Sequence, residues 1–174
     1  MSLKKNIKDI YLKLINDEAL MRLLHYKADH LDDDVLEITN DRPLISSMEI
    51  ESLWKLRDRH VVTSSIYGSL DKEEICRILI YPAGRRSSGN YFVANQDVAI
   101  EVLTHYSFRK DFRQESICDR LAGLLFNTNA TGIGKIDGVS GDAINPNGLP
   151  PNFTGYRLLF RFGSSKGGAP NDLT

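Results

Sequence analysis

The segment Val98–Phe108, VAIEVLTHYSF, decides the fold of this chain. Its residues fall into two alternating sets, because successive side chains of an extended strand point to opposite faces of a sheet. One set is Val98, Ile100, Val102, Thr104, Tyr106 and Phe108, and the other is Ala99, Glu101, Leu103, His105 and Ser107. The first set is mainly apolar and the second is mixed, so the segment predicts a long, half-buried strand.

A second strand is predicted directly before this one. The segment Ile75–Tyr81, ICRILIY, is apolar on both faces, as is typical of a strand in the middle of a sheet. Pro82 and Gly84 predict its end, and the composition of Arg85–Asn90 predicts a loop. Because neighbouring strands joined by a short loop prefer to be antiparallel, we expect the two to form an antiparallel pair.

Further strands are expected on both sides of this pair in the sequence. Val61–Tyr67 is β-branched and aromatic, and Gly68–Ser69 predicts its end. A short strand is expected over Ile133–Val139, followed by a long loop through Pro151. The last strand is expected over Phe153–Phe162. It would turn Tyr156, Leu158, Phe160 and Phe162 inward, and Arg157 and Arg161 outward.

Helical periodicity marks the N-terminal region. The apolar residues Ile7, Ile10, Tyr11, Leu14 and Ile15 recur at helical spacing. Asn16–Glu18 then reads either as a break with a new N-cap or as a kink in one longer helix. Residues 25–46 carry many Asp, Asn and Pro residues and predict an irregular loop.

Two more helices are predicted from capping-box patterns, in which a polar N-cap residue is followed three residues later by Glu or Gln. Ser46–Glu49 predicts a helix near residues 47–58, and Asp111 with Gln114 predicts another. The second helix has one apolar stripe, made of Ile117, Cys118, Leu121, Leu124 and Leu125.

These elements predict an α+β fold, with a mostly antiparallel sheet of about four strands and helices packed on one face. A length of 174 residues fits one domain, expected over residues 1–163, with a flexible Gly/Ser-rich tail over 164–174. The net charge of −1 leaves no basic excess for general binding to nucleic acid or membranes. The N-terminus lacks the apolar core of a signal peptide, so we expect synthesis in a cytoplasm.

Motifs for catalysis or metal binding are incomplete. Gly132–Lys135 lacks the first glycine of a phosphate loop, and Gly138–Gly141 is followed by Asp142 where a nucleophile elbow has glycine. His25 and His30 have no cysteine pair nearby, and Asp29–Asp34 is interpreted as a solvated acidic turn. Cys76 and Cys118 are expected to be buried free thiols. We therefore expect no enzymatic activity, no cofactor and no metal.

Contacts with partner proteins are expected in the loops Arg85–Asn90 and Gly138–Asn152, and next in the C-terminal tail, because long loops in a compact domain are usually functional or disordered. The basic pair at residues 85 and 86 suits an acidic partner. The candidate contact residues are Arg85, Arg86, Ser87, Asn90, Asp142, Asn145, Asn147, Arg157 and Arg161.

The order of these elements resembles the tail-terminator and head–tail joining (neck) proteins of tailed bacteriophages. The similar segments cover most of the chain and carry no catalytic chemistry. They are Asn6–Tyr11, Leu23–Tyr26 with its acidic loop, Ile117–Arg120 leading to Leu124–Phe126, Thr131–Lys135 and Gly155–Leu158.

The resemblance implies a virion structural protein that forms a homo-oligomeric ring, typically a hexamer. Its partners would be the tail-tube and head-connector proteins, with no membrane partner, and nucleic acid would be met only as genome DNA passing through the ring. Other virion positions, namely baseplate, tail tube or head completion, remain open. So does a small nucleic-acid-binding protein that acts through Arg85, Arg86 and Lys135.

Overall fold

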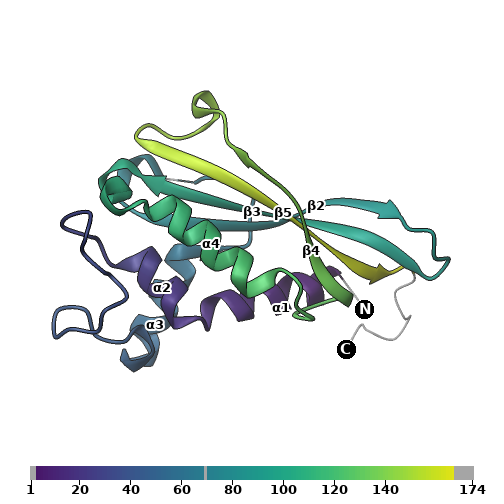
Figure 1. Ribbon diagram of the computed structural model, residues 1–174, viewed down its shortest axis with the longest axis horizontal. Coiled ribbons are helices and arrows are strands. Elements are labelled where there is room, and N and C mark those ends of the chain that lie inside the picture. Colours follow the sequence, from purple (N-terminus) through teal and green to yellow (C-terminus); the bar gives the residue numbers. More distant parts are fainter. Residues whose placement is uncertain (1–2, 69, 167–174) are drawn as a thin grey trace.

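A five-stranded sheet runs along the length of the protein (Figure 1). The structure is a computed structural model that describes residues 3–68 and 70–166. The strands are β1 (Val61–Val62), β2 (Cys76–Ser87), β3 (Val93–His105), β4 (Ile133–Ala143) and β5 (Phe153–Ser165). Their order is β1-β2-β3-β5-β4; β1 is parallel to β2, and the other neighbouring pairs are antiparallel.

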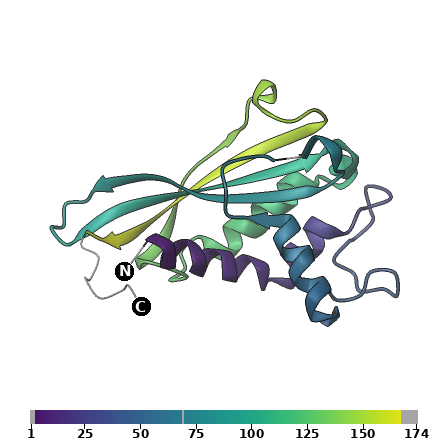
Figure 2. The same ribbon diagram turned by 180° about the vertical axis from the view of Figure 1, so that it is seen from behind.

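Helices pack against one face of this sheet, as the two opposite views show (Figures 1 and 2). The α-helices are α1 (Leu3–Ile15), α2 (Glu18–His25), α3 (Ile50–His60) and α4 (Arg113–Leu125). Short 3-10 turns are η1 (Ile45–Ser47), η2 (Leu70–Lys72), η3 (Tyr106–Asp111) and η4 (Pro146–Gly148). Helices α1, α2 and α4 lie along the sheet, and α3 lies beside α2. None of these helices has the length and apolar composition of a bilayer span, within the described ranges.

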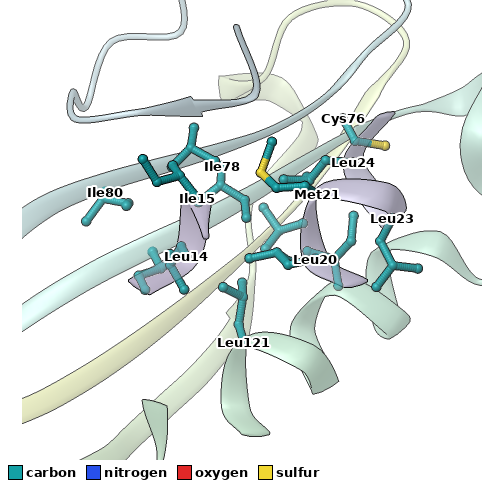
Figure 3. Close-up of a cluster of buried hydrophobic side chains, with 14 of the residues drawn as sticks. Leu14, Ile15, Leu20, Met21, Leu23, Leu24, Cys76, Ile78, Ile80 and Leu121 are labelled. Atoms are coloured by element: carbon teal, nitrogen blue, oxygen red, sulfur yellow. The ribbon is translucent and has the colours of Figure 1, made fainter. Parts of the chain in front are cut away.

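The main core lies between the helices and the sheet (Figure 3). Its labelled side chains are Leu14 and Ile15 of α1, Leu20, Met21, Leu23 and Leu24 of α2, Cys76, Ile78 and Ile80 of β2, and Leu121 of α4. Burial of one such aliphatic side chain stabilises the fold by about 1.5–3 kcal/mol. The predicted stripe of α4 supplies Ile117, Leu121 and Leu125 to this core. The architecture confirms the predicted α+β fold.

A smaller apolar cluster covers part of the opposite face of the sheet. It consists of Leu70, Ile75, Leu79, Leu103 and Phe153. On the same face, the side chains of Arg157 and Arg161 contact Glu101 and Asp97. Every residue of β3 from 96 to 105 is buried, so the prediction of a half-buried strand is wrong.

The sequence predicts that strand β2 ends at Pro82, and this prediction is wrong. The strand continues to Ser87, with a register shift between Pro82 and Arg85. Because β1 pairs only with Ile78 and Leu79, no strand among the described residues flanks Pro82 on its other side. A proline is tolerated at such an edge, and a bulge absorbs the irregularity. The predicted Arg85–Asn90 loop is accordingly strand up to Ser87.

Two other predicted strands end earlier in the structure than the sequence predicts, although β3 also begins earlier, at Val93. Val61–Tyr67 forms a strand only over Val61–Val62, since the Ser64 hydroxyl accepts a bond from the Ile66 amide and starts a local turn. Strand β3 ends at His105, whose ring accepts a bond from the Ser107 amide at the start of η3. At both places a hydrogen bond between a side chain and the nearby backbone therefore competes with pairing to a neighbouring strand.

The N-terminal break is confirmed, because α1 and α2 are separate helices. The Asp17 carboxylate accepts a bond from the Leu20 amide at 2.8 Å, as an N-cap does. The capping box predicted at Ser46–Glu49 is wrong: α3 begins after Glu49 without a side-chain cap. Instead the Ser46 amide donates to the carboxylate of Glu18.

The second capping box is also wrong. Helix α4 begins after Phe112, which has φ of 52° and no side-chain cap. The Asp111 carboxylate instead accepts bonds from the guanidinium of Arg113, at 3.0 and 2.7 Å. The guanidinium offers this carboxylate two donors and a full positive charge, which favours the pair over a cap on a single backbone amide.

The C-terminal half has longer strands than predicted. Strand β4 runs to Ala143 rather than Val139, and β5 runs to Ser165 rather than Phe162. The long loop predicted after residue 139 is therefore reduced to residues 144–152. The predicted flexible tail falls mostly on residues 167–174, outside the described residues, and both the tail and the single domain stay predictions.

Candidate functional site

The partner-contacting residues predicted from the sequence lie in three separate places. Arg85, Arg86, Ser87 and Asn90 lie at the β2–β3 turn, Arg157 and Arg161 lie in the middle of β5, and Asp142, Asn145 and Asn147 lie toward the other end of the sheet. Strand β3 has 13 residues, so the two ends are about 40 Å apart at ~3.4 Å per residue. The structure therefore does not bring these residues into one site.

At the β2–β3 turn, the predicted residues are exposed and joined to the end of β5. Lys166 donates its Nζ to Ser87 Oγ at 3.1 Å and to the Asn90 carbonyl at 3.0 Å. The guanidinium of Arg85 donates to the carbonyl of Ser165. Arg86 is exposed as well. Three basic side chains thus gather at one end of the sheet.

Sequence reasoning missed two aromatic residues at this turn. Tyr91 is 83% exposed and Phe92 is 74% exposed, with their rings edge to face at 5.2 Å. The signal was present in the sequence, as an aromatic dipeptide between a polar turn and the next strand. Such exposure is costly in water and marks an interaction site when it is clustered. We call Arg85, Arg86, Tyr91, Phe92 and Lys166 the hairpin tip.

Arg157 and Arg161 form ion pairs with their own chain, on the face of the sheet away from the helices. Arg157 Nε lies 2.8 Å from Glu101 Oε1, and Arg161 Nε lies 2.6 Å from Asp97 Oδ1. Hydrogen bonds to these carboxylates raise the pKa of both arginines. Their charges are therefore largely neutralised where they lie.

The third group of predicted residues surrounds η4. Asn145 accepts a bond from the Asn147 amide at 3.0 Å and so caps this turn. Asp142 lies opposite Arg157 in the β4–β5 pairing. All three side chains are exposed, but the two asparagines also have this local structural role.

A second exposed region lies at the end of the molecule opposite the hairpin tip, in the connection of residues 26–49 between α2 and α3 (Figures 1 and 2). Arg22, only 2% exposed, holds this irregular segment in one conformation. Its guanidinium donates to the carbonyls of Val35 (3.2 Å), Glu37 (2.6 Å), Arg42 (3.1 Å) and Pro43 (2.7 Å). The irregular loop predicted here is confirmed, and it is an ordered one.

Two further contacts hold the same connection. The carboxylate of Glu18 accepts bonds from the amides of Ile45 and Ser46, at 2.6 and 2.9 Å. Arg42 donates to both oxygens of Asp33 at 2.6 Å, which holds the pKa of that carboxyl well below its usual range. Asp33 is thus tightly paired, whereas Asp29 in the same predicted solvated turn lies at 4.0 Å from Arg42 and is largely exposed.

The surface of this connection is acidic and apolar at once. Residues 28–51 contain eight acidic residues and one basic residue, Arg42. Large apolar side chains are also exposed there and on the adjoining α3, namely Leu31, Leu36, Ile38, Leu44, Ile50 and Trp54. We call Leu31, Asp32, Leu36, Glu37 and Ile38 the acidic surface. The sequence showed its charge but not the exposure of its apolar side chains.

The incomplete chemical motifs lie in structural positions. Gly132 directly precedes β4, Ile133–Lys135 are the first residues of that strand, and Gly138–Gly141 lies further along it. The two free cysteines are Cys76, which is buried, and Cys118, which is partly buried. Burial raises the pKa of both thiols to about 12. Both are therefore protonated and unreactive at neutral pH.

His25 contacts His60 rather than His30. His25 Nδ1 lies 3.4 Å from His60 Nε2, and His60 Nδ1 lies 2.8 Å from the carbonyl of Cys76. Burial lowers the pKa of His60 to about 4. Over residues 3–68 and 70–166, no group of three or more His, Cys, Asp or Glu side chains is placed to hold a metal ion.

Comparison with known proteins identifies the family of this chain. The chain belongs to the YomW family, whose model matches residues 17–162. It is 28% identical to the SPbeta prophage-derived uncharacterized protein YomW of Bacillus subtilis (strain 168), over 90% of this chain and 94% of that protein. A chain from the virion of a native gene transfer agent particle is similar in structure, with a TM-score of 0.51 and 12% identity, over 91% of this chain and 93% of that chain. At that identity the likeness shows a shared fold.

Proposed function

We propose that this protein is a structural component of a phage virion, and specifically a tail terminator. In this role copies of the chain form a ring, which we expect to be hexameric, that caps the tail tube and docks to the head connector. The observation that carries the proposal is the shared architecture with a chain of a gene transfer agent particle over nine-tenths of both chains. The prophage origin of the Bacillus subtilis relative agrees with it.

The distribution of exposed side chains supports a role in assembly. Apolar side chains are exposed in clusters at the hairpin tip and on the acidic surface, at opposite ends of the molecule. A protein with two different contact surfaces can form heterologous contacts, which give a ring when the rotation closes. The surfaces found here are of the kind that a ring subunit needs.

The first test is the mass of the purified chain in solution, measured by light scattering over a concentration series. A second series contains tail tubes purified from a phage or prophage that encodes this family. We expect a ring of defined mass, or sedimentation of the protein with the tubes. Electron microscopy of capped tubes should then show extra density at one end. A monomer that ignores the tubes would contradict the proposed tail terminator.

The other virion positions are separated by the partner that co-purifies. A tail terminator should bind both the tail tube and the head connector. Binding to the connector alone would indicate a head-completion protein, and incorporation along the whole tube would indicate a tail-tube protein. Recovery only with the distal end of the tail would indicate the baseplate.

Binding to nucleic acid is the second candidate, since one observation favours it. Arg86, Asn95, Gly163 and Ile133 are register partners on successive strands, which places Lys135 at the same end of the sheet as Arg85 and Arg86. This function predicts salt-sensitive DNA binding that is lost in the Arg85→Ala, Arg86→Ala, Lys135→Ala triple variant. DNA binding that is unchanged in this variant would exclude these three residues as the DNA site.

A further inference from the structure

We infer that neighbouring copies of this chain bind end to end, with the hairpin tip of one copy docked on the acidic surface of the next. The inference rests on the proposed ring, because it names the contact by which that ring would form. Each copy offers one basic, aromatic surface and one acidic, apolar surface. The occupant of the acidic surface is therefore a second copy of this chain.

The hairpin tip has binding groups that its own chain uses only in part. Arg85 donates to the Ser165 carbonyl, but neither Arg85 nor Arg86 takes part in an ion pair within the described residues, and both side chains are exposed. Tyr91 and Phe92 contact each other edge to face and are otherwise mostly exposed. Aromatic and arginine side chains are those that most often dominate the energy of protein interfaces. The tip thus has the composition of a binding anchor.

The acidic surface complements the hairpin tip in both charge and polarity. Leu31 is 57% exposed and Ile38 is 61% exposed, and both flank carboxylates that form no ion pair in the described part of the chain. These carboxylates belong to Asp32 and Glu37, which are exposed. Apolar groups give such a contact its affinity, while opposite charges give it orientation and speed.

A hollow beside Leu31 and Leu36 provides a place for a cationic side chain. It measures about 310 Å³, and its lining includes Asp34, Asp111 and Arg120. Arg120 is paired with Asp17, and Asp111 uses Oδ2 to bind Arg113 while its Oδ1 is buried. The exposed carboxylate of Asp34 is therefore the group that an entering guanidinium or ammonium group would meet, and the opposite charges favour that contact.

The geometry favours a contact between copies over a contact within one copy. The tip and the acidic surface lie at opposite ends of a long sheet, so they cannot meet in the same molecule. Two tips would bring arginines together, and two acidic surfaces would bring carboxylates together, and both arrangements are repulsive. The complementary arrangement is heterologous, which is the type that closes into rings.

The acidic surface is also ordered before any partner arrives. Four carbonyl contacts from Arg22 and the pairing of Arg42 with Asp33 hold the connection in place. Binding to such a surface does not require a disordered loop to be ordered first, which would weaken the affinity. The buried arginine thus prepares the contact surface without taking part in the contact.

A charge exchange tests this contact in the full-length protein. The Arg85→Glu, Arg86→Glu variant and the Asp32→Lys, Glu37→Lys variant should each lose self-association, measured by sedimentation or light scattering. We expect each to weaken association about tenfold or more, from like-charge repulsion. The variant that combines all four substitutions should associate again. The control is Asp119→Lys, an exposed charge on α4 outside both surfaces, which should associate as the wild type does.

The apolar part of the contact has its own variant and control. Tyr91→Ser with Phe92→Ser should weaken association at least about a hundredfold, because two exposed aromatic anchors are removed. Ile66→Ser removes a side chain that is 75% exposed but lies outside both surfaces, and it should have no effect. Thermal unfolding of each variant verifies that it is folded.

The outcomes separate the end-to-end contact from the proposed function. If the wild type forms rings and the charge and aromatic variants do so equally well, the contact is overturned and the ring remains. Loss of association that the fourfold exchange does not restore, or a similar loss in Asp119→Lys, also overturns it. A wild type that stays monomeric at high concentration overturns the contact, while binding to tail tubes then decides the proposed function separately.

Discussion

Arg22 is the single residue on which most of the order at one end of this protein depends. It is buried, and its guanidinium donates to four backbone carbonyls of a segment with little regular structure. Backbone carbonyls outside helices and strands still need hydrogen-bond donors, and one arginine supplies donors to several of them. A residue in a helix thus determines the conformation of a distant loop.

Replacement of Arg22 by methionine should therefore be strongly destabilising. The change leaves four carbonyls without this donor, and loss of one member of a buried polar network typically costs about 3–5 kcal/mol. Chemical denaturation followed by tryptophan fluorescence measures the free energy of unfolding. Lys55→Met, at an exposed position on α3, is the control and should change stability by less than about 0.5 kcal/mol. A similar small change in Arg22→Met would contradict the role given to the guanidinium.

His60 should make the stability of the protein depend on pH. Burial lowers its pKa to about 4, below the value of about 6.5 in an unfolded chain. Between these values the unfolded state binds more protons, so the stabilisation is complete above pH ~6.5 and is lost as the pH falls toward ~4. The expected loss is up to about 3 kcal/mol.

The measurement is the free energy of unfolding from pH 7 to pH 4, for the wild type and for His60→Asn. The variant should be less stable at pH 7 and should show a smaller decrease on acidification. His30→Gln removes an exposed histidine and serves as the control. A parallel pH dependence in wild type and His60→Asn would contradict this account.

At the scale of elements, the entry into β4 depends on a glycine turn. Gly132 has φ of 73°, and a Cβ there would lie 2.5 Å from the carbonyl oxygen of Gly163 on β5. Gly134 has a similar φ of 78° but open space around it. A side chain would meet similar backbone strain at both glycines, but only Gly134 has room for it.

Substitution by alanine should separate these two effects. Gly134→Ala should cost about 1 kcal/mol, the usual strain of a left-handed residue with a side chain. Gly132→Ala should cost clearly more, since β4 must also move away from β5. Thermal and chemical unfolding of the two variants measure the difference. Equal costs would show that the clash is relieved without disturbing the β4–β5 pairing.

The sequence predicted the type of most elements but not where they end. The alternation in Val98–Phe108 and the stripe of α4 gave the sheet and its helical face. The predicted ends failed where a tertiary contact outcompeted a local signal. Pro82 does not end β2, because it lies at an open edge, and Asp111 does not cap α4, because it pairs with Arg113. Such contacts join residues whose proximity is not visible in the sequence.

The candidate site was predicted only in part, for a related reason. The basic pair Arg85 and Arg86 was found from composition and lies at the hairpin tip. Tyr91 and Phe92 beside it were missed, since an aromatic dipeptide reads equally well as core. Likewise, Arg157 and Arg161 could be assigned to the outer face, but their pairing with Glu101 and Asp97 depends on the β3–β5 register.

At the scale of the whole molecule, the uneven distribution of charge predicts a salt dependence. The net charge is only −1, yet acidic residues concentrate in residues 28–51 and the hairpin tip is basic. End-to-end association should weaken about tenfold between roughly 0.05 and 0.5 M salt, as the screening length falls well below 10 Å. Sedimentation at several salt concentrations measures this.

The charge-exchanged variant provides the control for this salt dependence. After the exchange the hairpin tip carries a charge of −1, because Lys166 is unchanged, and the acidic surface carries +2, compared with +3 and −2 in the wild type. The attraction persists but is smaller, so association should still weaken with salt, less steeply than in the wild type. Association that strengthens with salt in the wild type would indicate a contact governed by apolar groups alone.

The position of β5 has a consequence for synthesis of the protein in the cell. Among the described strands it is the last to leave the ribosome, yet it lies between β3 and β4 and pairs along the whole of β3. Until it arrives, β3 has an open edge and β4 has no neighbour, so pairing must wait for contacts between residues as distant as Val93 and Ser165. Such contacts make folding slow, because a long chain must be closed first. A translation product interrupted before β5 should therefore remain unfolded and open to proteolysis, and only chains synthesised through β5 should reach the folded state.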